Sequence, residues 1–164
     1  MSSESHDIEW IAKRFDELSL LELYEVMQLR QSIFVVEQNS CYQDADGLDI
    51  SCWHLLGRTS AEIVGYLRVL RPGQRYAEAS VGRLAVDKRY RGTGLGRQLA
   101  EEGLRLVNRL YPGQPLRVTA QQYLERFYES FGFVRVGEPF SEDGIPHVEM
   151  YLNDPTGSFQ GAKS

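Results

Sequence analysis

Several features that mark specialised classes of protein are scarce or missing in this chain. Cysteine occurs twice, at Cys41 and Cys52, and no C-x-x-C or histidine-rich spacing is present, so we expect free thiols, no disulfide framework and no metal site. No apolar run approaches the roughly 18 residues of a membrane span, and the first residues are polar and acidic. These absences predict a cytoplasmic protein with no membrane partner.

Positive charge is also in the minority, because the chain has 23 acidic residues against 18 lysines and arginines. This balance argues against nucleic acid as a partner. The length of 164 residues suits a single domain with a sizeable core. We expect that domain over residues 1–152 and a polar tail over residues 153–164, where Pro155, Gly157 and Gly161 favour fraying.

The cations that are present gather around a glycine-rich turn between Val86 and Leu99. They are Lys88, Arg89, Arg91 and Arg97, and the glycines are Gly92, Gly94 and Gly96. The glycines should allow positive φ and a close approach of the backbone to a ligand. The helix that follows offers unpaired N–H groups and the positive end of its dipole. Together these features predict a site for a polyphosphate.

The spacing of the glycines separates several kinds of phosphate site. A P-loop requires Lys-Ser or Lys-Thr after its last glycine, where this chain has Arg97-Gln98. A dinucleotide fingerprint requires an acidic residue about 20 positions later, where this chain has Pro112-Gly113. An ordinary strand-to-helix turn would leave the arginines unexplained.

The motif R-x-x-G-x-G, at residues 91–96, instead resembles the pyrophosphate-binding signature of the GNAT superfamily of N-acetyltransferases, which bind acetyl-CoA. The resemblance implies that the turn and the first residues of the helix contact the cofactor. These residues are Arg91, Gly92, Thr93, Gly94, Leu95, Gly96 and Arg97.

A second segment, residues 121–133, ends in F-Y-x-x-x-G-F and is similar to a later motif of the same superfamily. The tyrosine of the F-Y pair there lies near the cofactor sulfur and protonates the departing thiolate. This implies that role for Tyr128 and cofactor contacts for Gln121 and Phe127. A core role for Tyr128 is the alternative, although it lies one step off the apolar stripe formed by Tyr123, Phe127 and Phe131.

Periodicity along the chain predicts alternating strands and helices. Strands are expected at 8–14, 52–58, 62–70, 79–87, 116–120, 133–139 and 145–152, and helices at 20–34, 95–110 and 122–130. Ser19 and Glu22 form a capping box, and the last hairpin should turn near Asp143-Gly144. Gly103 inside the longest helix suggests a close approach to a strand. The order is similar to the α+β fold of the GNAT superfamily, a mixed, mostly antiparallel central sheet flanked by helices.

In that fold the strand before the glycine turn splays from the next strand, and the pantetheine arm lies between them. The resemblance therefore implies backbone contacts to the cofactor at Leu84, Ala85 and Val86. An N–H near Leu84 would face the thioester oxygen and stabilise negative charge during transfer.

Other segments point to one branch of the superfamily. They are residues 29–38, Tyr42, Asp46-Gly47, Asp49, His54-Leu55 and residues 144–150, and they resemble the ElaA-type group. That resemblance does not identify the acceptor.

The transfer also needs a base to accept a proton from the acceptor amine. Glu37 ends a helical region, where partial burial could raise its pKa; the alternative is a carboxylate paired with Arg30 or with a backbone amide. His54 is the competing candidate, although a buried histidine with both nitrogens bonded is common in such a strand. His147 and Glu149 share one side of the last hairpin and are further acceptor candidates, unless that side is solvated.

The loop of residues 43–49 carries three carboxylates, and Asp46 among them is a candidate acceptor contact. The loop could form the negative wall of a pocket for a cationic amine, or it could be a solvated turn. Calcium is disfavoured, since an EF-hand needs glutamate where this chain has Leu55.

These observations predict an acetyl-CoA-dependent N-acetyltransferase that acts on a primary amine of a small molecule or peptide. Neither cysteine lies in a motif of a catalytic nucleophile, so we expect direct transfer in a ternary complex. The alternative is a non-catalytic acyl-CoA-binding sensor or interaction module. Exposed edge strands in the last hairpin are compatible with a homodimer.

Overall fold

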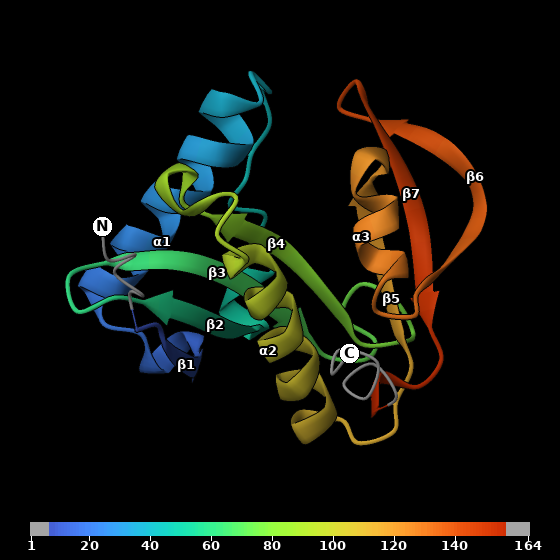
Figure 1. Cartoon of the computed structure of the whole chain (residues 1–164), viewed down its shortest axis with the longest axis horizontal. Coiled ribbons are helices and arrows are strands. Elements are labelled where there is room, and N and C mark those ends of the chain that lie inside the picture. The colour runs from blue at the N-terminus through green and yellow to red at the C-terminus, as the bar shows by residue number, and fades with distance from the viewer. Residues whose placement is uncertain (1–6, 157–164) are drawn as a thin grey trace.

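The computed structural model describes residues 7–156, so most of the predicted tail lies outside the described residues. The strands are β1 (Glu9–Arg14), β2 (Trp53–Arg58), β3 (Ile63–Leu70), β4 (Ser80–Val86), β5 (Leu116–Gln121), β6 (Val134–Glu142) and β7 (Ile145–Leu152). The α-helices are α1 (Leu20–Arg30), α2 (Leu95–Leu110) and α3 (Glu125–Glu129). The π-helical segment η2 (Gln31–Glu37) continues α1, and short 3-10 turns include Lys88–Tyr90 and Gln122–Leu124. The predicted order of elements is confirmed (Figure 1).

The seven strands form two antiparallel sheets instead of one continuous sheet. The first has the order β1-β2-β3-β4, and the second has the order β5-β7-β6. One parallel bridge joins them, between Ala79 and Leu116, where the Arg117 N–H donates to the Ala79 carbonyl at 3.0 Å. Beyond this bridge β4 and β5 diverge, and the two halves of the molecule open like a V (Figure 1). The predicted splay after the first sheet is confirmed.

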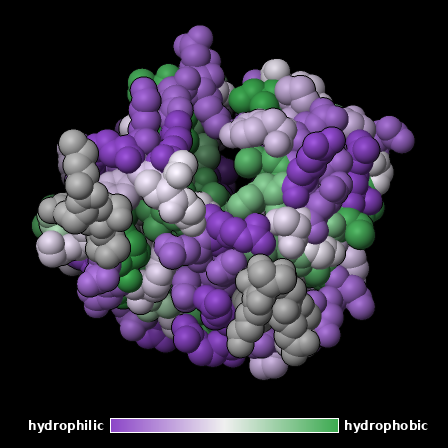
Figure 2. All heavy atoms as spheres, viewed as in Figure 1, coloured by the Kyte–Doolittle hydropathy of each residue, from purple (hydrophilic) through white to green (hydrophobic). Residues whose placement is uncertain are grey.

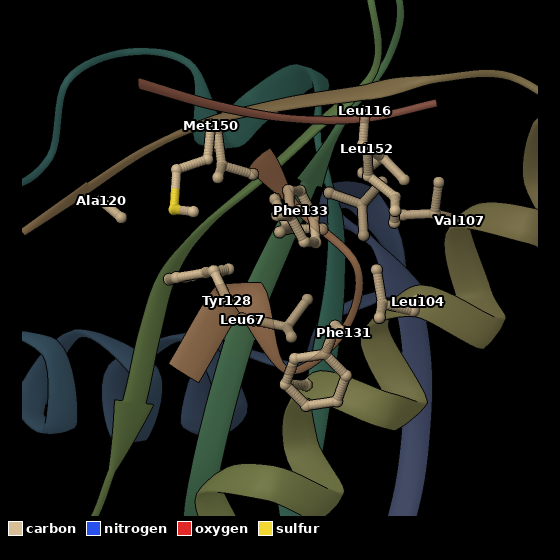
Figure 3. Packing of buried hydrophobic residues seen from close by; sticks show 14 of the residues in the cluster. Leu67, Leu104, Val107, Leu116, Ala120, Tyr128, Phe131, Phe133, Met150 and Leu152 are labelled. Carbon is tan, nitrogen blue, oxygen red and sulfur yellow. The ribbon is translucent and has the colours of Figure 1, made fainter. Parts of the chain in front are cut away.

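Helices cover both faces of the first sheet. On one face, Val26 and Leu29 of α1 pack with Leu56, Tyr66 and other apolar residues. On the other face, α2 packs in a larger cluster that also joins both sheets and α3 (Figure 3). The apolar side of α2 is therefore its packed side.

Gly103 brings α2 very close to β3. A Cβ at this position would lie 2.5 Å from Cδ2 of Leu67, which confirms the predicted close approach. The capping box is confirmed too, since the Glu22 N–H donates to Ser19 Oγ at 3.0 Å and the Ser19 N–H donates to Glu22 Oε1 at 2.8 Å. The last hairpin turns at Asp143 and Gly144, whose φ angles of 52° and 77° are the positive values that a two-residue turn requires.

The aromatic residues near α3 depart from the predicted stripe. Tyr123 lies in a 3-10 turn and is 73% exposed, so it is not a core residue. The buried aromatic group instead contains Tyr128, Phe131 and Phe133 (Figure 3). The rings of Tyr128 and Phe133 meet edge to face at a centroid distance of 5.5 Å. Tyr128 therefore belongs to the core by its ring, whichever role its hydroxyl has.

Over residues 7–156, no helix combines the length and the apolar character that a bilayer crossing requires.

Candidate functional site

A cavity of about 900 Å³ lies where β4 and β5 diverge. Its walls come from β4, from the end of β5, from α3, from the end of η2 and from the β6–β7 hairpin. In Figure 2 the surface is hollowed between the two halves, with apolar atoms along the walls. The cavity brings together eight of the residues predicted for the site, namely Glu37, Asp46, Leu84, Val86, Arg91, Gln121, Tyr128 and His147.

The glycine-rich turn continues the rim of this cavity from Arg91 into α2. Gly92 and Gly94 have φ angles of 77° and 89°, and a Cβ at either position would meet no atom within 4 Å. The turn therefore has the open space that a phosphate-bearing ligand would need. Gly96 was also expected to adopt a positive φ. That expectation was wrong, because Gly96 lies inside α2.

The arginines of the turn do not form one undivided positive patch. Arg89 is paired with Asp87 and Glu62. Arg97 Nη1 donates to Ser130 Oγ at 3.1 Å, and its guanidinium lies 4.7 Å from the centre of the Phe131 ring. Of these arginines, Arg91 is the one in the cavity wall.

Glu37 is paired with Arg91, and not with Arg30 or a backbone amide as the alternative prediction had it. Arg91 Nη2 donates to Glu37 Oε2 at 2.6 Å, and a second bond joins Nη1 and Oε1. The hydrogen bond from Arg91 lowers the pKa of the Glu37 carboxyl, whereas the sequence suggested that burial would raise it. That expectation was wrong because the side chain is 38% exposed and faces a cation.

The end of η2 is tied to both sides of the cleft. Glu37 reaches the glycine-rich turn through Arg91, and the adjacent Gln38 accepts a hydrogen bond of 3.1 Å from the Gln121 amide on β5. The segment thus spans the opening between the two sheets.

Strand β4 contains a β-bulge at the centre of the cavity wall. Gly82 pairs with Arg68 and Ala85 pairs with Tyr66, so Arg83 and Leu84 together oppose the single residue Leu67. Arg83 has a φ of 52°. The bulge interrupts the β3–β4 ladder where Leu84 was predicted to face the thioester.

The acidic loop is held by three arginines in a closed ring of ion pairs. Arg83 Nε lies 2.8 Å from Asp44, Asp44 lies 2.9 Å from Arg30, and Arg30 lies 2.7 Å from Asp49. From Asp49 the ring continues over 3.0 Å to Arg68, over 2.6 Å to Asp46, and over 3.5 Å back to Arg83. Arg30 and Arg68 are fully buried.

The prediction of a negative wall in this loop was wrong, because each carboxylate has guanidinium partners. Burial would raise the pKa of Asp46, but the hydrogen bond and charge of Arg68 outweigh it and hold that pKa well below its usual range. Asp46 does line the cavity, as a member of the neutral ring. Sequence reasoning did not select Arg68 or Arg83, although an arginine inside the apolar run of β3 is a sign of a buried ion pair.

Tyr128 presents its side chain to the cavity from α3. Burial raises the pKa of its hydroxyl to about 12, so the phenol is protonated at neutral pH. A protonated hydroxyl at this position can donate a proton to a nearby base or leaving group.

His54 was predicted as a candidate for the acceptor site, and the structure places it elsewhere. It is fully buried and outside the cavity wall; Nε2 lies 2.8 Å from the Asp49 carbonyl, and Nδ1 lies 2.7 Å from the Tyr66 hydroxyl. Because a carbonyl can only accept, Nε2 carries the proton and Nδ1 accepts from Tyr66. Desolvation lowers the pKa of the imidazole, which keeps it neutral.

His147 and Glu149, the two candidate acceptor contacts on β7, differ in their surroundings. His147 lines the cavity, with Nδ1 2.7 Å from the Ile145 carbonyl. Glu149 lies on the same side of β7 but outside the cavity wall, where Arg117 donates to it at 2.8 Å. Glu149 is therefore engaged in a partly buried ion pair outside the cavity wall and is not positioned as an acceptor contact.

Comparisons with known proteins agree with this architecture. A family model described as an acetyltransferase (GNAT) domain matches residues 35–153. Protein ElaA of Escherichia coli is 41% identical over 145 residues, which cover 87% of this chain and 95% of that protein. A UPF0039 protein of Schizosaccharomyces pombe is 35% identical, over 89% of this chain and 97% of that protein.

Solved structures give the same result. The crystal structure of Escherichia coli ElaA superposes with a TM-score of 0.84 at 40% identity, covering 89% of this chain and 99% of that one. An acyl-CoA N-acyltransferase from Pseudomonas aeruginosa superposes with a TM-score of 0.85 at 38% identity, again over 89% and 99% of the two chains.

Proposed function

The chain belongs to the GNAT acetyltransferase family, and from that premise we propose that it transfers the acetyl group of acetyl-CoA to a primary amine. The observation that carries the proposal is the cavity between β4 and β5, whose lining includes both Arg91 of the glycine-rich turn and Tyr128 of α3. Arg91 would bind a phosphate, and the Tyr128 hydroxyl would serve as a proton donor.

The described residues suit an acyl-CoA. The open left-handed glycines Gly92 and Gly94, the N-terminus of α2 and Arg91 would hold the pyrophosphate. The backbone of Leu84, Ala85 and Val86 would bond the pantetheine amides along the interrupted edge of β4. Gln121, Phe127 and Tyr128 would surround the sulfur end, and the thioester would supply an activated acyl carbon.

The chain's own groups would then stabilise the negative charge on the acyl oxygen, accept a proton from the amine and donate a proton to the sulfur. The N–H of Leu84 would donate to the acyl oxygen as negative charge develops there. Glu37 would accept the proton that the amine loses when its nitrogen bonds to the acyl carbon. The Tyr128 hydroxyl would donate a proton to the sulfur as the carbon–sulfur bond breaks, and solvent would restore that proton.

Glu37 can act in this way only after Arg91 releases it. A pyrophosphate at the turn would compete with the carboxylate for the same guanidinium. Occupation of the phosphate site would therefore free the base, which favours binding of acetyl-CoA before the amine is activated.

Direct transfer is favoured over an acyl-enzyme intermediate. Burial raises the pKa of the Cys52 thiol to about 11, and this thiol lies 3.0 Å from the Leu48 carbonyl. A thiol with so high a pKa is a poor nucleophile at neutral pH. Cys41 is exposed and is not part of the cavity wall.

The test is thiol release from acetyl-CoA across primary amines, including polyamines, amino acids, aminosugars and short peptides, with calorimetric titration of CoA alongside. Tyr128→Phe should lower turnover by about tenfold or more and leave CoA affinity unchanged. CoA binding without turnover on any amine would favour a sensor. Absence of CoA binding would refute the proposal.

A further inference from the structure

Arg83 has a backbone conformation that arginine rarely adopts. Its φ of 52° is positive, and the other non-glycine residues of this kind between 7 and 156 are Asn39 and Asp143. Asparagine and aspartate tolerate the left-handed region comparatively well. An arginine there therefore needs an explanation from its surroundings.

The conformation changes which side of β4 faces the cavity. Val81, before the bulge, packs in the larger apolar cluster, and Leu84 and Val86, after it, pack against that same cluster. Ala85 packs in the smaller cluster on the opposite face. In an uninterrupted strand residues 81 and 84 would face opposite sides. The extra residue at the bulge therefore sets the orientation of the backbone from 84 to 86.

The contacts of the Arg83 side chain hold this conformation. Its Nε lies 2.8 Å from Asp44 Oδ1, and its Nη2 lies 3.2 Å from the Asp44 carbonyl and 3.5 Å from Asp46. Those two carboxylates are themselves fixed by Arg30 and Arg68, which are 0% and 1% exposed. The guanidinium of Arg83 is thus paired with carboxylates that two buried arginines also hold.

We propose that Arg83 is a positioning residue for acyl transfer: anchored by Asp44 and Asp46, it maintains the bulge that presents the Leu84 N–H to the acyl carbonyl. Arg83 touches no reacting atom and acts through the backbone of its neighbour. The inference rests on the proposed function, which assigns that N–H to the acyl oxygen.

The test compares two substitutions at Arg83 with the same two at Arg117. Arg117 is a suitable control because it also lies in a strand beside the cleft, is similarly exposed and pairs with two carboxylates, Glu78 and Glu149. The probe is acetyl-CoA labelled with ¹³C at the carbonyl, and the readout is the infrared stretching frequency of the bound thioester. This measurement needs no acceptor.

A hydrogen bond from Leu84 should lower the carbonyl frequency of bound acetyl-CoA in the wild type. The shift should be lost in Arg83→Ala, because alanine disfavours positive φ, and kept in Arg83→Gly, because glycine adopts it without strain. Both Arg117 variants should keep the shift. Affinity for acetyl-CoA should fall in Arg83→Ala, because the backbone of residues 84–86 would also bond the pantetheine arm, and it should stay within about threefold in the other three variants.

This order of effects separates positioning from stability. If Arg83 only stabilised the fold, both variants would unfold at a lower temperature, but each would keep the wild-type carbonyl shift once it had bound acetyl-CoA. Retention of the shift in Arg83→Ala, or its loss in Arg83→Gly, would overturn the inference. If Arg83→Ala does not fold, Arg83→Val takes its place, because a β-branched side chain disfavours positive φ even more strongly, and retention of the shift in that variant would overturn the inference.

The wild-type protein distinguishes failure of the proposed function from failure of the role of Arg83. A wild-type protein that does not bind acetyl-CoA would refute the proposed function. One that binds acetyl-CoA without a carbonyl shift would leave the family assignment intact and refute the role of the bulge.

Discussion

Replacing Asp49 by asparagine should destabilise the protein strongly, because it removes one charge from the buried ring. Asp49 is 5% exposed and accepts from Arg30 at 2.7 Å and from Arg68 at 3.0 Å. Asparagine has nearly the same shape, but it leaves two buried guanidinium groups with a net positive charge. Breaking a buried ion pair in this way costs about 3–5 kcal/mol.

The loss should be visible in both urea and thermal unfolding. For a chain of this size each kcal/mol lowers Tm by about 2–4 °C, so Tm should fall by about 6–20 °C. Asp16→Asn is the matched control, because Asp16 is 77% exposed and lies 3.5 Å from Arg14. The control should change stability by less than about 1 kcal/mol.

The effect should depend on pH in a defined direction. Burial alone would raise the pKa of Asp49, but hydrogen bonds and charge from Arg30 and Arg68 outweigh it and lower that pKa. The stabilisation is therefore fully present above the unfolded pKa of about 3.9 and is lost as pH falls through the lower folded pKa. The difference between wild type and Asp49→Asn should shrink below about pH 4. A loss of stability under about 1 kcal/mol at pH 7 would mean that water can replace the Asp49 carboxylate as the partner of Arg30 and Arg68, and would refute the reasoning.

Three further outcomes follow from single contacts. Glu37→Gln should tighten CoA binding by up to about fivefold in calorimetry, because it releases Arg91 from a surface ion pair; weaker binding would mean that the two do not compete. Gly103→Ala should lower stability in urea by about 1 kcal/mol or more, since the clash with Leu67 exceeds the gain in helix propensity, and a gain would contradict the close approach. His54 should remain neutral at pH 6 with its proton on Nε2, as ¹⁵N NMR would detect; titration near pH 6.5 would contradict its buried contacts.

Local signals in the sequence predicted most of the fold because those signals act over short distances. The helix over residues 95–110, the capping box at Ser19 and the Asp143-Gly144 turn each depend on residues close together in the sequence, and each was confirmed. The splay between β4 and β5 was expected only from the family resemblance, because the point where two strands stop pairing is a property of the tertiary structure.

In the candidate site, too, the residues in local motifs were predicted, and the contacts between distant residues were not. The glycine-rich turn and Tyr128 each lie in a contiguous motif, so both were predicted as parts of the site from the sequence. Glu37 was selected, but its partner Arg91 lies 54 residues away, so its pKa was predicted in the wrong direction. The ring was missed because Arg30, Asp44 and Arg83 resemble surface residues until the fold brings them together.

Because the ring is neutral, its carboxylates cannot attract a cationic acceptor to the cavity. The remaining acidic groups at that end of the wall are Glu142 and Asp143, at the tip of the β6–β7 hairpin. Arg75 lies 3.9 Å from Glu142 and offsets part of that charge. Exposed charges of this kind act mainly through long-range attraction, which salt screens. The charge preference for the acceptor should therefore come from the hairpin and from Glu37 once Arg91 releases it, and this preference should weaken with ionic strength. The buried ring maintains the shape of the site, which should not depend on salt.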